Sequence, residues 1–109
     1  MGRGYVELQE TVAMPWPRAG DGRVLRGHEF HHSNLENLDA GVDFAYGVRR
    51  GHGIDGVHDG VVIHNLLAAY AHLRSGAGAS WAPRFVEFVR ARRAAARTRV
   101  SAAATVLAA

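Results

Sequence analysis

Apolar and polar side chains alternate along the first part of the chain, which is the period-two pattern of half-buried β-strands. In residues 5–11, Val6 and Leu8 fall on one side of such a strand. Asp59-Gly60 is a tight-turn dipeptide that leads into a short β-branched run typical of a buried strand. The predicted strands are residues 5–11, 23–31, 44–50 and 61–63. The pattern over residues 65–73 fits either a continued strand or a turn of helix.

The last third of the chain follows a helical period instead. Its apolar side chains share one face at helical spacing and predict an amphipathic helix over residues 81–97. These side chains are Trp81, Phe85, Phe88 and Val89. Ser80 is a good N-cap for this helix, and residues 99–109 are predicted to be a frayed extension or a loose alanine-rich tail. The pattern predicts the α/β fold class, although one helix leaves most of the sheet uncovered for a freestanding α/β domain.

Composition narrows the classes of protein to consider. With 109 residues and 48% hydrophobic content, the chain is one domain or a piece of one. It contains no cysteine, which excludes disulfides, thiolate metal sites and a cysteine nucleophile within these residues. No apolar run reaches the roughly 20 residues that span a bilayer, and the N-terminal residues lack a signal-peptide pattern. A soluble, cytoplasmic protein is therefore expected, with no membrane partner.

All thirteen basic residues are arginine, and residues 81–109 hold six of them against the single acidic residue Glu87. Such an uneven charge predicts a solvated helix face first and an anion-binding surface second. Nucleic-acid binding is not favoured, because the aromatic side chains of the helix fall on its apolar face rather than among the arginines.

The segment His28-Glu29-Phe30-His31-His32 matches the H-E-x-x-H pattern of zinc hydrolases. That chemistry needs a helix, whereas a strand would place His28 and His32 about 13 Å apart, at ~3.3 Å per residue. We keep a zinc hydrolase only as a remote alternative and expect no metal site. So many polar groups in five residues suit the rim of a polar pocket.

His72 follows a mostly apolar stretch and precedes a chain break at Arg74-Ser75-Gly76. A histidine at the end of a core strand stands at the mouth of the sheet, where α/β enzymes place reactive groups. On spacing alone, a partly buried structural histidine is favoured over a catalytic one.

Four motifs follow one another along the chain: RGHEFHHS, AYG, HDGVVIHNLLAAYAHL and WAPRFVEFVR. Their order resembles the C-terminal part of cobyrinic acid a,c-diamide synthases, whose usual strings are close to RGHEFHYS and LASYxHLH. The run RGHGIDGVHDG, with ENLD before it, resembles most the branch of that family that is linked to dissimilatory sulfur metabolism and thought to amidate sirohaem. The resemblance spans roughly residues 4–90. Ala69 and Arg74, which flank His72, depart from the family pattern.

The resemblance implies that residues 1–98 are the C-terminal portion of a flavodoxin-like class I glutamine amidotransferase domain. In the parent enzyme, a P-loop-like domain with ATP and Mg activates a tetrapyrrole carboxylate. The glutaminase domain releases ammonia from glutamine with a cysteine nucleophile and a histidine base. The resemblance makes His72 that base and places His28, Glu29 and His31 at the rim of the glutamine pocket. No cofactor is expected within this chain.

Without a cysteine or a P-loop, the chain alone is not expected to hydrolyse glutamine. The leading hypothesis is a truncated amidotransferase or the smaller half of a split one, with a separate chain or a homo-oligomer as partner. A second hypothesis is a non-catalytic module that binds a tetrapyrrole or another anion through arginines such as Arg49 and Arg50.

Overall fold

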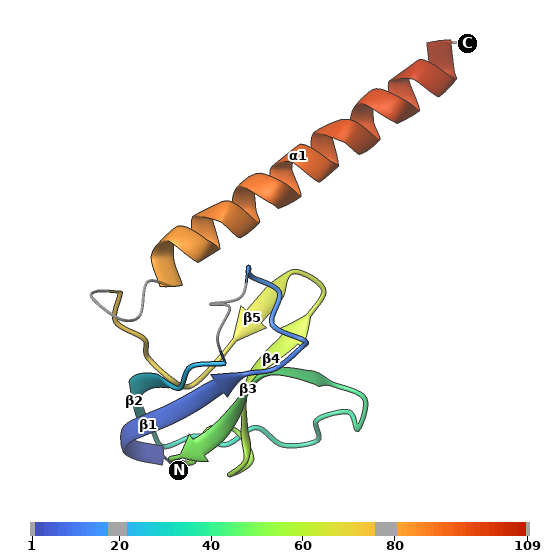
Figure 1. The fold of residues 1–109 in the computed structure, drawn as a ribbon. Coiled ribbons are helices and arrows are strands. Elements are labelled where there is room, and N and C mark those ends of the chain that lie inside the picture. Colours follow the sequence, from blue (N-terminus) through green and yellow to red (C-terminus); the bar gives the residue numbers. More distant parts are fainter. Residues whose placement is uncertain (1, 18–21, 76–80, 109) are drawn as a thin grey trace.

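The computed structural model describes residues 2–17, 22–75 and 81–108, which form a curled antiparallel sheet and one long helix (Figure 1). The elements are β1 (Gly2–Glu10), β2 (Leu25–His31), β3 (Asp43–Arg50), β4 (His58–Ile63), β5 (Leu66–Ala68) and α1 (Trp81–Ala108). The strand order is β2-β1-β3-β4-β5, and each neighbouring pair is antiparallel. The fold is therefore mixed α/β, as predicted.

The four predicted strands are all present, and the undecided segment after Ile63 contains the short strand β5. The Asp59-Gly60 dipeptide was predicted to be a turn before a strand, but it lies inside β4. The turn falls earlier, and Gly60 instead adopts a φ of 75° within the strand. Flavodoxin-like sheets are parallel, so the described strands do not by themselves display that fold.

The core lies on the face of the sheet to which β1 contributes Val6 and Leu8, which are 1% and 0% exposed. This confirms the alternation predicted for residues 5–11. The remaining core members are Met14, Leu25, Ala45 and Tyr46. The pairing of β1 with β3 shifts by one residue between Glu7 and Leu8. A shift of this kind increases the local twist, which fits the curl of the sheet.

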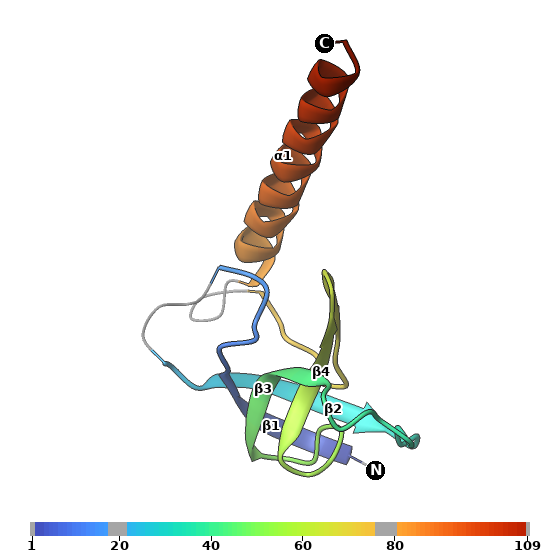
Figure 2. The same ribbon diagram turned by 90° about the vertical axis from the view of Figure 1, so that its right-hand side faces the viewer.

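Helix α1 is longer than predicted, because it continues through the stretch expected to be a tail. Its proposed N-cap, Ser80, lies outside the described residues. Only the start of the helix meets the sheet region, and the rest projects away from it (Figure 2). The predicted apolar face is correspondingly open, with Phe85 and Val89 42% and 45% exposed. Among the described residues, no helix has the length and apolar character needed to cross a membrane.

An ion pair and aromatic packing attach the first turns of α1 to the rest of the molecule. Arg84 forms an ion pair with Glu10 at 2.6 Å, and both side chains are largely buried. The Trp16 ring packs edge-on against Phe85 at a centroid distance of 5.4 Å. The Tyr46 side chain is buried near the start of α1. This burial raises the pKa of Tyr46 to about 12, and the nearby Glu10 carboxylate adds to the effect.

Candidate functional site

The structure brings the two histidine motifs together at the edge of the sheet. The backbone N–H of His28 donates to the carbonyl of His72 at 3.0 Å, and the N–H of His72 donates to the carbonyl of His28 at 2.7 Å. Strand β2 bonds to β1 on its other side, so His72 completes the outer edge of β2. Both histidine residues are exposed. The contact fixes the backbone of His72 and leaves its ring accessible.

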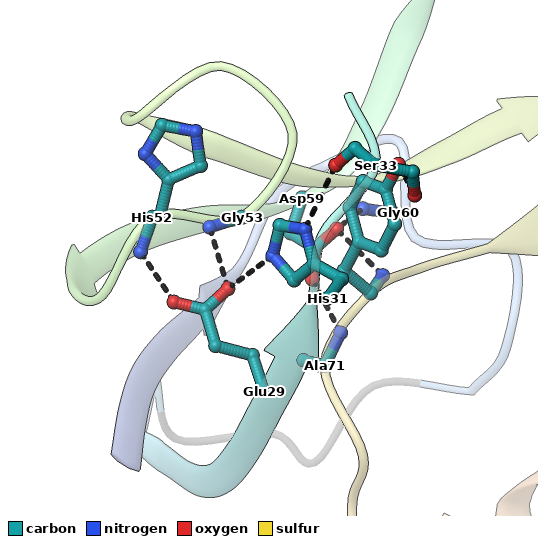
Figure 3. Close-up of polar contacts among 9 residues, drawn as sticks. Glu29, His31, Ser33, His52, Gly53, Asp59, Gly60 and Ala71 are labelled. Carbon is teal, nitrogen blue, oxygen red and sulfur yellow. Dashed lines mark hydrogen bonds and ion pairs between the residues drawn. The ribbon is translucent and has the colours of Figure 1, made fainter. Parts of the chain in front are cut away.

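Glu29 points into the interior from the same strand and is 2% exposed (Figure 3). Its carboxylate accepts the N–H groups of His52 at 2.7 Å and Gly53 at 2.9 Å, and contacts the ring of His31 at 3.0 Å. Burial raises the pKa of the Glu29 carboxyl, but the bonds from His52, His31 and Gly53 outweigh burial and hold that pKa below its ordinary value. A Cβ at Gly2 would overlap the side chains of Glu29 and His31, so the site requires glycine at this position.

His31 has an acceptor at each ring nitrogen. Nε2 lies 3.0 Å from the Glu29 carboxylate and Nδ1 lies 3.1 Å from the carbonyl of Ser33. The ring is therefore bonded on both sides, to a carboxylate and to a backbone carbonyl. The ring also stacks on Tyr70 at a centroid distance of 3.8 Å, and the Tyr70 hydroxyl bonds to the Ser33 hydroxyl at 2.9 Å. His31 therefore ties β2 to the segment that leads to His72.

Asp59 is fully buried in β4 and forms a second carboxylate centre (Figure 3). One oxygen accepts the N–H groups of Gly60 at 2.9 Å and Tyr70 at 3.0 Å, and the other accepts that of Ala71 at 2.9 Å. Sequence reasoning identified neither Asp59 nor Tyr70 as part of the site. The available signal was an acidic residue next to a buried β-branched run, where a charge needs bonded partners.

The four predicted site residues thus fall into two groups. His28 and His72 meet at the surface, whereas Glu29 and His31 lie in the interior with their polar atoms bonded to other parts of the chain. Residues 25–31 form β2, so the helix required by the zinc-hydrolase interpretation does not exist, and that interpretation is wrong. In the described part of the chain, no group of three acidic, His or Cys residues is arranged to hold a metal ion.

The arginines named for anion binding occupy the end of β3. Arg49 donates to the side-chain oxygen of Gln9 at 2.7 Å, so its guanidinium already has a polar partner. Arg50 is exposed and faces Glu7 in the register with β1. An anion-binding role for these two residues stays a prediction.

The fold and site together define a mixed α/β structure with an accessible histidine held at a sheet edge by paired backbone bonds to β2. No family model matches the chain, and no solved structure matches it. Curated relatives do match. The chain is 44% identical over 91 residues to the cobyrinate a,c-diamide synthase of Magnetococcus marinus, a match that covers 84% of this chain and 19% of the relative.

Two archaeal proteins of the same name are also similar. The Halobacterium salinarum protein is 49% identical over 69 residues, which are 63% of this chain and 15% of the relative. The Methanosarcina acetivorans protein is 40% identical over 67 residues, which are 62% of this chain and 14% of the relative. These matches confirm the resemblance to cobyrinate a,c-diamide synthases, and the chain spans less than a fifth of the length of each.

Proposed function

We propose that this chain is the C-terminal part of the glutaminase domain of an ATP-dependent, glutamine-hydrolysing amidoligase that acts on tetrapyrrole carboxylates. The supporting observation is the 44% identity to a cobyrinate a,c-diamide synthase. A match over 91 of the 109 residues necessarily includes both histidine motifs. Cobyrinic acid is the substrate that the relatives' name indicates, and the sirohaem-type motifs make a sirohaem carboxylate the competing substrate.

In this proposal His72 is the general base of the glutaminase. It takes the proton of a cysteine thiol, the thiolate attacks the side-chain amide carbon of glutamine, and the imidazolium returns that proton to the departing nitrogen. Ammonia leaves a glutamyl thioester, which water hydrolyses to glutamate and the free thiol. The paired backbone bonds to His28 support this role, because they fix the position from which an accessible imidazole can act. Glu29 and His31 would stabilise the pocket from beneath, since their side chains are bonded within the interior.

The thiol must come from outside these 109 residues, which contain no cysteine. The part of the enzyme that carries the cysteine would also supply the parallel strands of a flavodoxin-like glutaminase domain. The antiparallel sheet described here would then be the C-terminal layer of that domain. ATP and Mg would belong to the P-loop-like domain of the same enzyme. Whether the missing part is joined to this chain or separate, it would have to meet the edge where His72 lies.

A chimera tests this proposal. The C-terminal segment of the Magnetococcus marinus relative is replaced by this chain, and glutamate release from glutamine is measured. The chimera should be active, and the isolated chain should not. His72→Ala should lower the rate by at least about 10²-fold, the lower limit for a general base.

His64→Asn is the matched control for that variant. His64 is also exposed but has a φ of 54°, a conformation that asparagine tolerates, so this variant should keep its activity. An active His72→Ala chimera, or ammonia release by the isolated chain, would refute the proposal.

A further inference from the structure

We infer that Asp59 is the positioning residue for His72. Its buried carboxylate holds the backbone of the two residues that precede His72 and thereby fixes the direction from which the imidazole leaves the sheet. The inference rests on the proposed role of His72 as a base and adds to it the group that sets its geometry.

The contacts of Asp59 are those of a structural anchor for one particular segment. Its two carboxylate oxygens accept three backbone N–H groups at 2.9–3.0 Å, and two of these belong to Tyr70 and Ala71. The carboxylate is 0% exposed. Burying a charged group is costly unless it is hydrogen-bonded, so this arrangement is stable only while the segment stays in place.

The segment needs such an anchor because it has left the regular sheet. Strand β5 ends at Ala68, and the next ladder contact is the isolated pairing of His72 with His28. In between, the N–H groups of Tyr70 and Ala71 have the Asp59 side chain as acceptor where a strand partner would normally serve. Asp59 therefore takes the place of a neighbouring strand just before the proposed base.

His72 is consequently held from two sides. Asp59 fixes the two residues before it from β4, and His28 fixes its own N–H and C=O from β2. The ring of Tyr70, stacked on His31, ties the same segment to the interior. With the backbone fixed in this way, the remaining freedom of the imidazole is rotation about its side-chain bonds.

Asp59→Asn is the variant that tests this inference. The asparagine amide has one oxygen, so its NH₂ group must face at least one N–H donor, and residues 70–72 should shift. A displacement of about 1 Å at a catalytic group can lower a rate by ~10²-fold. In the chimera we therefore expect a 10- to 100-fold fall in kcat for glutamine hydrolysis. The KM for glutamine should change little, because a misplaced base affects the chemical step rather than binding.

The control is Asp55→Asn. Asp55 also accepts two backbone N–H groups, those of Val57 and His58, but these lie within three residues of it in the sequence. In the 109-residue chain, amide hydrogen exchange at Tyr70, Ala71 and His72 should accelerate in Asp59→Asn and stay unchanged in Asp55→Asn. Unchanged exchange in Asp59→Asn would overturn the inference at the structural level.

A second variant displaces His72 from the opposite side and leaves Asp59 intact. A Cβ at Gly27 would lie 2.8 Å from the carbonyl oxygen of His72, whereas one at Gly41 would have no atom within 4 Å. Gly27→Ala should therefore lower kcat as Asp59→Asn does, and Gly41→Ala should not. If Asp59→Asn does not fold, Ala71→Pro replaces it, because proline removes the backbone N–H that one Asp59 oxygen accepts, and a parental kcat in that variant would overturn the inference.

The outcomes separate the inference from the proposed function. If His72→Ala leaves the chimera active, the role of His72 fails. If His72→Ala abolishes activity while Asp59→Asn keeps the parental kcat, His72 is the base but its position does not depend on Asp59.

Discussion

Replacement of Glu29 by glutamine should destabilise the folded chain strongly, because the two carboxylate oxygens receive three donors. One oxygen accepts the N–H of His52, and the other accepts the N–H of Gly53 and contacts the ring of His31. Glutamine keeps a single oxygen. Whichever way the amide is turned, its NH₂ group faces at least one donor that then has no acceptor.

The magnitude follows from these contacts. A buried donor without a partner costs about 1–3 kcal/mol, and each remaining bond falls from the charged to the neutral range, a loss of about 1 kcal/mol. The free energy of unfolding should therefore fall by about 3–5 kcal/mol. For a chain of this size, about 4 °C per kcal/mol predicts a melting temperature lower by about 12–20 °C.

Urea unfolding followed by circular dichroism measures this difference. Glu36→Gln is the matched control, because it removes the same charge from an exposed position and should change stability by no more than about 0.5 kcal/mol. A Glu29→Gln variant within about 0.5 kcal/mol of the parent would refute the reasoning, because its three contacts would then contribute nothing net.

Two further predictions concern pH and the base of the helix. The pKa of Glu29 in the folded chain lies below its ordinary value of 4.5, so its stabilisation is fully present above pH 4.5 and is lost as the pH falls through the lowered value. Melting temperatures of the parent and Glu29→Gln should converge between pH 4.5 and pH 2; a constant difference would contradict this. Arg84→Ala removes the partly buried ion pair with Glu10 and should cost about 2 kcal/mol, with a red shift of tryptophan emission as Trp16 becomes exposed. Arg93→Ala, exposed on the same helix, should change neither quantity.

Local patterns predicted the strands well because the residues of each strand carry the pattern that identifies it. Val6 and Leu8 repeat with period two, and both are buried. The apolar face of α1 was also predicted. The helical spacing of its apolar residues does not indicate, however, which surface packs against that face. In the structure only its first turns, near Trp16, have such a surface.

The site was predicted less completely, because its contacts are non-local. The pairing of His28 with His72 joins segments that three strands separate in the sequence, and neither spacing nor composition determines such a register. Glu29 and His31 were predicted at the rim of the glutamine pocket, which stays a prediction, and the structure places both side chains in the interior. However, the partners of Glu29 include the backbone N–H groups of His52 and Gly53, which no side-chain pattern reveals.

The attachment of α1 at one end gives this helix the geometry of a lever. Its 28 residues extend about 42 Å at ~1.5 Å per residue, and its ion pair with the rest of the molecule lies in the first turn. About 36 Å of this length lies beyond Arg84, so a rotation of about 10° there would carry the far end through roughly 6 Å. Small changes in packing around Trp16 and Glu10 are therefore amplified along the helix, while the edge that holds His72 stays with the sheet.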